Sequence, residues 1–329
     1  MREEILRIPS ATREDLVLTA FHFGVRAAKP HVAIVAGLHG DEYNGVFAAA
    51  QMVHRLSALK PDQIPGRITV IPAVNVFGLN TGSRFWPFDD TDINRMFPGY
   101  ALGETTQRIA ASVTAAISEA THLIDIHASN DALRELPQVR LYDQDVSIVD
   151  EARSFRLPFV WRRLPSAAVA NQMTYLFSKR IPNAYILQAG SAGRINKRFV
   201  QDVVGGIGRF LTHVSAVNAS AFASDGDGIE SVVLDSTRIG FCYALDAGIF
   251  VTAVSTGDHV EDGDLIGEII SPLDGTVRAT LLSPITGVVM TLRVSPVVYD
   301  NDLLARIAST EPESHPVTIR SLREDFEMQ

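Results

Sequence analysis

The sequence predicts an α/β protein in which a mixed sheet is flanked by helices and followed by a smaller all-β domain. Between about residues 31 and 215, short apolar runs alternate with helix-like stretches, as in a mixed or mostly parallel sheet with helices on both faces. After about residue 225, short strand-like runs are separated by Gly-Asp, Asp-Gly and Ser-Pro turns, which are typical of a compact all-β module. We therefore expect two domains, residues 1–224 and 225–329.

The elements of the first domain follow from where the apolar runs fall. Strands are predicted at residues 32–38, 67–74, 122–126, 139–142, 157–161 and 184–188. Helices are predicted at about residues 44–59, 104–120, 171–180 and 197–214. Residues 215–228 are rich in Ser, Ala, Asp and Gly, so they are predicted to form the linker between the domains.

The composition indicates a globular protein, and its single cysteine fits either a reducing compartment or a protein that needs no disulfides. With 329 residues, of which 46% are hydrophobic and 20% charged, the chain can bury a substantial core. The one cysteine, Cys242, excludes an intramolecular disulfide framework and a zinc site built from several thiolates. The N-terminus lacks the apolar core of a signal peptide, and no uncharged apolar run approaches the ~20 residues that span a bilayer. We expect a cytoplasmic protein that does not bind membranes.

The net charge of −9 is divided unevenly between the two predicted domains. Residues 225–329 hold 18 acidic residues against 6 arginines, whereas residues 1–224 hold 20 acidic residues against 23 lysines and arginines. An acidic domain repels nucleic acid and anionic membranes, and a slightly basic one suits small anionic substrates. A solvated acidic surface without a function would give the same division. We expect a small-molecule substrate and no nucleic-acid partner.

Three residues at the ends of two predicted strands have the spacing of metal ligands. His39 and Glu42 lie three residues apart directly after the apolar run 31–36, and His127 closes a second apolar run. Open α/β sheets bind ligands at the carboxyl ends of their strands. Two histidines and a carboxylate give Zn²⁺ three protein ligands and leave a fourth position open, so we expect one Zn²⁺ per chain. Asp125 either orients His127 or serves as a buried capping carboxylate.

A long irregular stretch, residues 82–99, is dense in polar groups, and long loops of this kind usually serve function. The planar guanidiniums of Arg84 and Arg95 suit a substrate carboxylate or a developing oxyanion, and Asn94 could assist. The alternative is that both arginines pair with the acidic residues of the loop and hold it in place. These acidic residues are Asp89, Asp90 and Asp92.

Three motifs in order, residues 37–45, 92–99 and 125–127, resemble the succinylglutamate desuccinylase and aspartoacylase family. The resemblance covers about residues 30–215, and the trailing β module also fits the family's plan. It implies a zinc-dependent amidohydrolase with a carboxypeptidase-like fold that hydrolyses a small N-acyl amino acid. The roles it implies are zinc ligation by His39, Glu42 and His127, carboxylate binding by Asn94 and Arg95, and oxyanion support by Arg84.

The chain departs from the family at one catalytic position. The family places a glutamate general base in a Glu-x-Gly setting on a late strand, where this chain has Gln188, Ala189 and Gly190. An amide cannot take a proton at neutral pH, and loss of a general base costs about 10²–10⁴-fold in rate. Either Glu135 or Asp125 replaces the base, or an easier substrate such as an ester is hydrolysed, or the chain binds a small carboxylate without catalysis.

The second domain contains turns similar to those of biotinyl and lipoyl carrier domains, at residues 257–266 and 283–290. Those carriers attach their group to a lysine at a hairpin tip, and Lys197 is the last lysine of the chain. We therefore expect the domain to act as a lid, a spacer or a contact in a homo-oligomer. An acidic domain that narrows the cleft makes a peptidase acting on long peptides the weaker hypothesis.

Overall fold

The computed structural model describes residues 1–12, 14–142, 145–165, 169–170, 172–181 and 183–310. The chain divides into two compact units, which are described separately below. Unit 1 contains residues 1–130 and 137–233, and unit 2 contains residues 131–136 and 234–329. The division at residue 233 lies slightly beyond the expected domain boundary at residue 224. No pattern in the sequence indicated that residues 131–136 belong to the later unit.

Unit 1 is built on a mixed sheet, as the alternation of elements predicts. Its strands follow the order β1-β2-β4-β3-β5-β8-β6, and β7 pairs with β6 and β9 with β7. Strands β4, β3, β5 and β8 pair in parallel, whereas β1 and β2 join antiparallel at one side. The strands are β1 (Arg2–Ile8), β2 (Leu16–Gly24), β3 (His31–Ala36), β4 (Arg67–Ile71), β5 (His122–Ser129), β6 (Leu133–Leu141), β7 (Phe159–Arg162), β8 (Ala184–Ser191) and β9 (Val232–Leu234).

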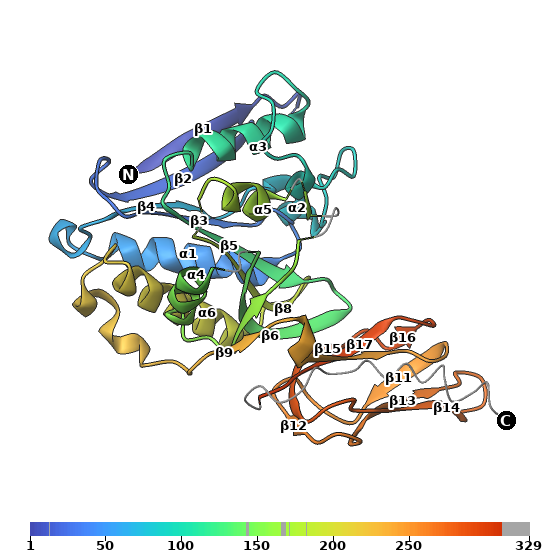
Figure 1. Ribbon diagram of the computed structural model, residues 1–329. Coiled ribbons are helices and arrows are strands. Elements are labelled where there is room, and N and C mark those ends of the chain that lie inside the picture. Colours follow the sequence, from blue (N-terminus) through green and yellow to red (C-terminus); the bar gives the residue numbers. More distant parts are fainter. Residues whose placement is uncertain (13, 143–144, 166–168, 171, 182, 311–329) are drawn as a thin grey trace. The chain divides into compact units, whose positions relative to one another are not determined.

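Helices cover both faces of this sheet (Figure 1). Ala33 and Val35 of β3 and Leu123 of β5 pack in one core cluster with α3 and α5. The opposite face, with Tyr185 of β8, packs against Phe210 of α6. The helices of unit 1 are α1 (Tyr43–Ser57), α2 (Val76–Thr81), α3 (Thr105–Ala116), α4 (Val146–Arg153), α5 (Met173–Ser178) and α6 (Lys197–His213), with 3-10 helices at Pro61–Gln63, Ile93–Arg95 and Ala219–Asp225. None of the described helices is long and apolar enough to cross a bilayer.

Several elements were not anticipated from the sequence. The hairpin of β1 and β2 precedes the predicted alternation, and β1 carries two arginines and two glutamates on a half-exposed strand, so it lacks an apolar run. Helices α2 and α4 are short and lie in stretches for which no element was predicted. The predicted linker contains the 3-10 helix Ala219–Asp225. Short or solvent-facing elements bury too few apolar side chains for their period to be visible.

Unit 2 is all-β, in agreement with its turn-rich sequence. Strands β15, β17 and β10 form an antiparallel sheet in which β15 also pairs with residues 133–135 of β6 and with β12. A second sheet has the order β14-β13-β11-β16. Apolar residues of both sheets form one core. The strands are β10 (Ile239–Tyr243), β11 (Gly248–Thr252), β12 (His259–Val260), β13 (Leu265–Ile270), β14 (Val277–Leu282), β15 (Gly287–Arg293), β16 (Val297–Val298) and β17 (Leu303–Ala308), with a 3-10 helix at Ser236–Arg238.

Candidate metal centre

The predicted metal ligands come together at the carboxyl ends of two neighbouring parallel strands. His39 follows β3, Glu42 directly precedes α1, and His127 lies near the end of β5. The loop between β3 and α1 is tight because Gly40 lies against the backbone of Gly78, where a Cβ atom would come within 2.1 Å of a carbonyl carbon. Only glycine fits this approach. The loop therefore turns His39 and Glu42 back towards β5.

The three side chains form a compact, buried cluster. The Nδ1 atom of His39 lies 2.7 Å from one carboxylate oxygen of Glu42, and the Nδ1 atom of His127 lies 2.9 Å from the other. One donor atom from each of the three residues lies within 4.8 Å of the others. All three residues are buried. The structure thus places together the set of two histidines and one carboxylate expected from the sequence.

Each imidazole also contacts a second carboxylate, through its outer nitrogen Nε2. The Nε2 atom of His39 lies 3.2 Å from Oδ1 of Asp92, and the Nε2 atom of His127 lies 3.0 Å from Oδ2 of Asp125. The hydroxyl of Thr174, on α5, donates a hydrogen bond of 2.6 Å to the same oxygen of Asp125. Carboxylates in this position fix the orientation of a ligating histidine and make it more basic.

The electrostatics of the cluster favour positive charge on the imidazoles. Burial opposes a charge on His127, but the carboxylates of Asp125 and Glu42 outweigh burial and raise the pKa of His127 to about 10. Burial likewise opposes a charge on His39, and Glu42 and Asp92 outweigh it and raise its pKa. Burial by itself would raise the pKa of Glu42, but the two histidines lower it below its usual range.

The donor set fits a divalent cation. Three carboxylates, those of Glu42, Asp92 and Asp125, surround two imidazoles, and among the described residues the guanidiniums that contact them belong to Arg84 and Arg95. With both imidazoles neutral, these groups carry one excess negative charge, so either bound protons or a cation must balance it. Neutral imidazole and carboxylate are ligands that Zn²⁺ accepts. The inner Nδ1 atoms and Glu42 form the site that would hold the ion.

Arg84 contacts the cluster directly. Its guanidinium donates a hydrogen bond of 3.1 Å to Glu42, and its side chain is 34% exposed. Arg84 therefore contacts a predicted metal ligand, and it does not pair with the acidic residues of its own loop in the way the alternative hypothesis proposed. One nitrogen of the Arg84 guanidinium contacts the cluster. Because the side chain is partly exposed, the guanidinium stays accessible to a ligand.

Asn94 and Arg95 reach the site through a 3-10 helix that Asp92 caps. Asp92 accepts a hydrogen bond from the backbone N–H of Asn94 and lies 3.6 Å from the guanidinium of Arg95. The side-chain oxygen of Asn94 accepts from the backbone N–H of Met173, on α5. The alternative hypothesis was that both arginines pair with acidic residues of their own loop. The contact between Asp92 and Arg95 is a pair of this kind. It leaves the Arg95 side chain 37% exposed, next to the carboxylate that also contacts His39.

Gln188 lies next to His127 on the neighbouring strand. The two residues are register partners in the parallel pair of β5 and β8, so their side chains leave the sheet on the same face. Of the two carboxylates considered as a replacement base, Asp125 is occupied with His127 and Thr174. Glu135 belongs to unit 2, where it pairs with Arg306 at 2.7 Å.

Sequence reasoning missed three residues that support the centre. Asp92 was considered only as a partner of the loop arginines, although its position two residues before Asn94 marks a helix cap. No sequence pattern around Thr174 indicated that it would contact Asp125. Asn44, inside the first motif, donates from its amide to the carbonyls of Ala189 and Ser191 and so ties the start of α1 to the end of β8.

The fold and the cluster define an α/β protein with a candidate metal centre at its strand ends. A model of the succinylglutamate desuccinylase/aspartoacylase catalytic domain matches residues 28–214, which is more than half of the chain. The chain therefore belongs to the succinylglutamate desuccinylase/aspartoacylase family, as its motifs predict.

Known proteins similar to the chain include one with a described reaction. An N-alpha-acetyl-L-2,4-diaminobutyric acid deacetylase from Halomonas elongata is 25% identical over 253 residues, which cover 74% of this chain and 71% of that protein. A succinylglutamate desuccinylase/aspartoacylase from Rhodobacter sphaeroides has a TM-score of 0.79 at 22% identity and covers 95% of this chain and 96% of its own. The ectoine utilization protein EutE (DoeB) from Ruegeria pomeroyi has a TM-score of 0.77 at 20% identity, covering 93% and 94%. The two structures share the fold of this chain.

Proposed function

We propose that the chain is a zinc-dependent deacylase that hydrolyses the amide of a small N-acyl amino acid. The observation that carries this proposal is the buried cluster of His39, Glu42 and His127, in which Asp92 and Asp125 hold the outer nitrogens. Zn²⁺ bound there would act as a Lewis acid that polarises a carbonyl group and lowers the pKa of water. Family membership and the deacetylase relative support the same reaction class.

The residues of the chain have separate tasks in this reaction. Asp92 and Asp125 keep both imidazoles in one orientation, so the ligand atoms need no rearrangement when the ion binds. Arg84, beside Glu42, can stabilise the negative charge that develops on the amide oxygen.

Asn94 and Arg95 orient the substrate in the site. Arg95 presents a half-exposed guanidinium that suits the carboxylate of an amino acid. The backbone N–H of Met173 donates to the oxygen of the Asn94 amide, so the nitrogen of the same amide is the atom that would donate to the substrate. A carboxylate bound by these two residues would place the amide of the substrate over the cluster.

Gln188 supports a second candidate function. A neutral amide beside His127 can donate a hydrogen bond to a substrate oxygen, but it cannot accept a proton at neutral pH. The second candidate is therefore a protein that binds a small carboxylate through its metal and does not turn it over. An esterase is a variant of the first hypothesis, because hydrolysis of an ester depends less on a general base than hydrolysis of an amide does.

The first experiment measures metal content and product release together. The purified chain is analysed for zinc and assayed with N-acetyl, N-succinyl and N-formyl amino acids, starting with N-acetyl-2,4-diaminobutyrate because of the deacetylase relative. Matching esters are included. The assay compares the natural chain with Gln188→Glu and with chelator-treated protein.

The outcomes separate the two candidate functions. About one zinc per chain, with turnover that chelation abolishes, supports the deacylase. Zinc with turnover only in Gln188→Glu, at a gain of about 10²–10⁴-fold, supports the binding protein. A chain that binds no divalent metal contradicts both.

A further inference from the structure

The second sheet of unit 2 has apolar side chains on both of its faces. It consists of β14, β13, β11 and β16, and one face packs into the core of the unit. Phe250, Ile266 and Leu281 belong to that core. An antiparallel sheet with one face in water normally alternates apolar and polar residues along each strand. In this sheet most outward positions are apolar as well, so the alternation is largely missing.

One row of apolar side chains crosses the whole outer face. Ile249 of β11 is the register partner of Val297 on β16 and of Ile270 on β13. Ile270 is in turn the register partner of Val277 on β14. Register partners in antiparallel strands point to the same face. Val297, Ile249 and Val277 are between 36% and 55% exposed, and Ile270 is partly exposed. The four side chains therefore form an apolar strip across all four strands.

Three further residues widen this strip. Val251 lies two residues after Ile249 on β11, so it projects from the same face. Leu265 and Leu282 are register partners, and each is next in sequence to a core residue, so both point away from the core. All three side chains are exposed. We call the row and these three residues the outer apolar face.

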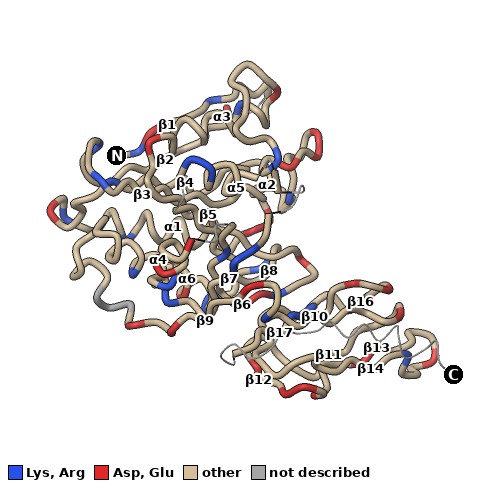
Figure 2. Tube along the Cα trace, viewed as in Figure 1, with Lys and Arg blue, Asp and Glu red and all other residues tan. Residues whose placement is uncertain are grey.

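The outer apolar face carries little charge, although unit 2 is acidic. Residues 234–310 hold 10 acidic residues against 4 arginines. Nine of these acidic residues lie between the strands, and Glu268, the register partner of Val251, is the one that lies on a strand (Figure 2). Arg278, next to Val277, donates to the carbonyl of Ala247 at 2.8 Å. One acidic and one basic side chain leave the face without net charge.

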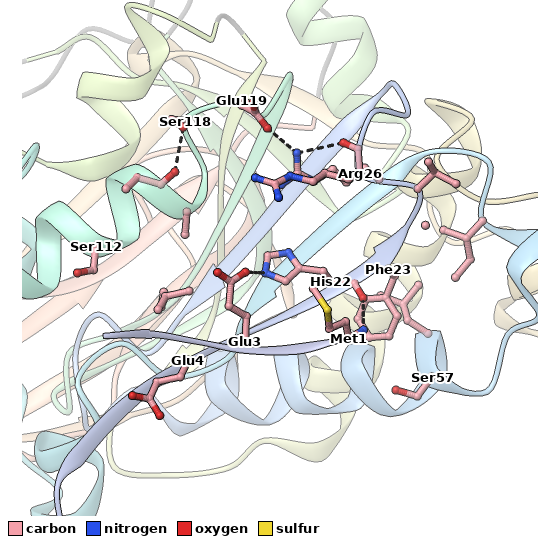
Figure 3. Close-up of a pocket in the computed structure, with 18 of the residues that line it drawn as sticks. Met1, Glu3, Glu4, His22, Phe23, Arg26, Ser57, Ser112, Ser118 and Glu119 are labelled. Atoms are coloured by element: carbon pink, nitrogen blue, oxygen red, sulfur yellow. Dashed lines mark hydrogen bonds and ion pairs between the residues drawn. The ribbon is translucent and has the colours of Figure 1, made fainter. Parts of the chain in front are cut away.

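Two regions of unit 1 provide the contrast. The half-exposed strand β1 carries two arginines and two glutamates. A cavity of about 1110 Å³ along β1, β2 and α3 also presents charged groups, and these pair with one another (Figure 3). Glu3 lies 2.8 Å from His22, and Glu119 lies 2.6 Å from Arg67. Charged groups of this kind are stable in water, so neither region needs a partner to cover it.

We propose that the outer apolar face binds the same face of a second copy of this chain. The row is symmetric, because it has the order Val, Ile, Ile, Val across the four strands. A two-fold axis between two such faces, either along the row or across its centre, would place valine over valine and isoleucine over isoleucine. Interfaces in which both copies use the same patch are typical of homodimers. Unit 2 is then a contact in an oligomer, whatever reaction the metal centre performs.

Charge and area both favour a second copy as the partner. Two acidic units repel each other, so they can meet closely only where their surfaces carry little charge. A strongly charged partner would find no excess counter-charge on the outer apolar face. These seven apolar side chains on each copy would bury roughly 1,000 Å² in total, which is the lower limit for a specific interface. We therefore expect a dimer with a Kd in the micromolar range.

The test measures the mass of the natural chain in solution by sedimentation velocity over a range of concentrations. The mass should correspond to two chains at high micromolar concentration and fall towards one chain on dilution. The fraction of dimer at each concentration gives the Kd, which can then be compared between variants.

Charged variants locate the interface. Ile249→Glu places one negative charge at the centre of the row on each copy, and Val277→Glu places one at its end. Like charges that meet in an interface are strongly unfavourable, so the Kd should rise by at least about 100-fold in Ile249→Glu and at least about tenfold in Val277→Glu. Val146→Glu makes the same change at an exposed valine of α4 in unit 1. Its Kd should change by less than about twofold.

A milder variant guards against misfolding of Ile249→Glu. Ile249→Thr keeps a β-branched residue that suits a strand, but it adds a hydroxyl to the interface. Its Kd should rise by about tenfold. Circular dichroism and thermal unfolding show whether each variant keeps the fold of the natural chain.

A natural chain that stays monomeric at its highest soluble concentration would overturn the proposal. A dimer whose Kd is unchanged in both Ile249→Thr and Val277→Glu would do the same. The end of the chain, residues 311–329, lies outside the described residues, so a chain that ends at residue 310 is measured as well. If the full chain is monomeric and only the shorter chain dimerises, the end of the chain covers the face and the proposal is wrong.

Discussion

Two buried glutamates, one in each unit, have opposite surroundings. The side chains of Glu42 and Glu135 are each only 2% exposed. Glu135 lies in a row across three strands, where its register partner is Thr291 and the register partner of Thr291 is Arg306. Glu42 contacts two histidines and an arginine that come from three separate segments of the chain.

The difference lies in how the charge is balanced. The carboxylate of Glu135 lies 2.7 Å from the guanidinium of Arg306, so a cation faces this buried anion directly. The cluster of Glu42 contains more carboxylate than guanidinium charge, and this excess requires protons or a metal ion. Burial of a carboxylate therefore does not by itself mark function. An imbalance that a cation would relieve distinguishes the candidate metal centre from the structural ion pair.

The largest expected effect tests the imbalance directly. Glu42→Gln replaces a candidate ligand oxygen and removes the negative charge that faces both imidazoles. We expect zinc affinity to fall by at least about 10³-fold, more than the roughly 10–100-fold that loss of an outer partner costs, and activity to fall with it. Zinc content after dialysis and product release measure both. Retention of stoichiometric zinc in this variant would contradict the assignment.

The matching change in unit 2 should act on stability. Glu135→Gln removes the buried carboxylate that faces the half-buried guanidinium of Arg306, and loss of one partner of a buried pair costs up to about 3–5 kcal/mol in the free energy of unfolding. Urea denaturation measures this change, and zinc content should stay as in the natural chain. The double variant Glu135→Leu with Arg306→Met should recover most of the loss, because apolar residues can replace a buried pair. Loss of zinc in folded Glu135→Gln would break the comparison.

A smaller effect is expected from the carboxylate that holds His127. Asp125→Asn keeps the shape but removes the charge that orients the imidazole and makes it more basic. Zinc affinity should fall by about 10–100-fold, measured by competition with a chelator of known affinity. Asp92→Asn, the equivalent change at His39, is the matched variant and should fall in the same range. Unchanged affinity in both would show that neither carboxylate tunes the histidines.

The smallest effect concerns the hydroxyl that fixes Asp125. Thr174→Val removes its hydrogen bond to the carboxylate and should weaken zinc binding by up to about tenfold. Thr174→Ser keeps the hydroxyl and should bind zinc as the natural chain does. Equal losses in the two variants would point to packing of α5 as the cause.

Local sequence patterns predicted much of the centre because its candidate ligands lie at or beside the ends of regular elements. His39 and Glu42 are close in sequence, at the end of an apolar strand, and His127 closes the parallel neighbour of that strand. The mixed sheet and the all-β unit also followed from periodicity and turn residues. The hairpin of β1 and β2 did not, since its charged, half-exposed residues leave no apolar period.

By itself, the sequence determined the family, the fold class and the three candidate ligands, because strand periodicity and short spacings are local properties. Only the tertiary structure decided which carboxylates contact the candidate ligands and orient them. Asp92 meets His39 across 53 positions, whereas Glu135 pairs with Arg306 across 171. Contacts between residues so far apart in the sequence depend on how strands and loops pack, so no local sequence pattern predicts them.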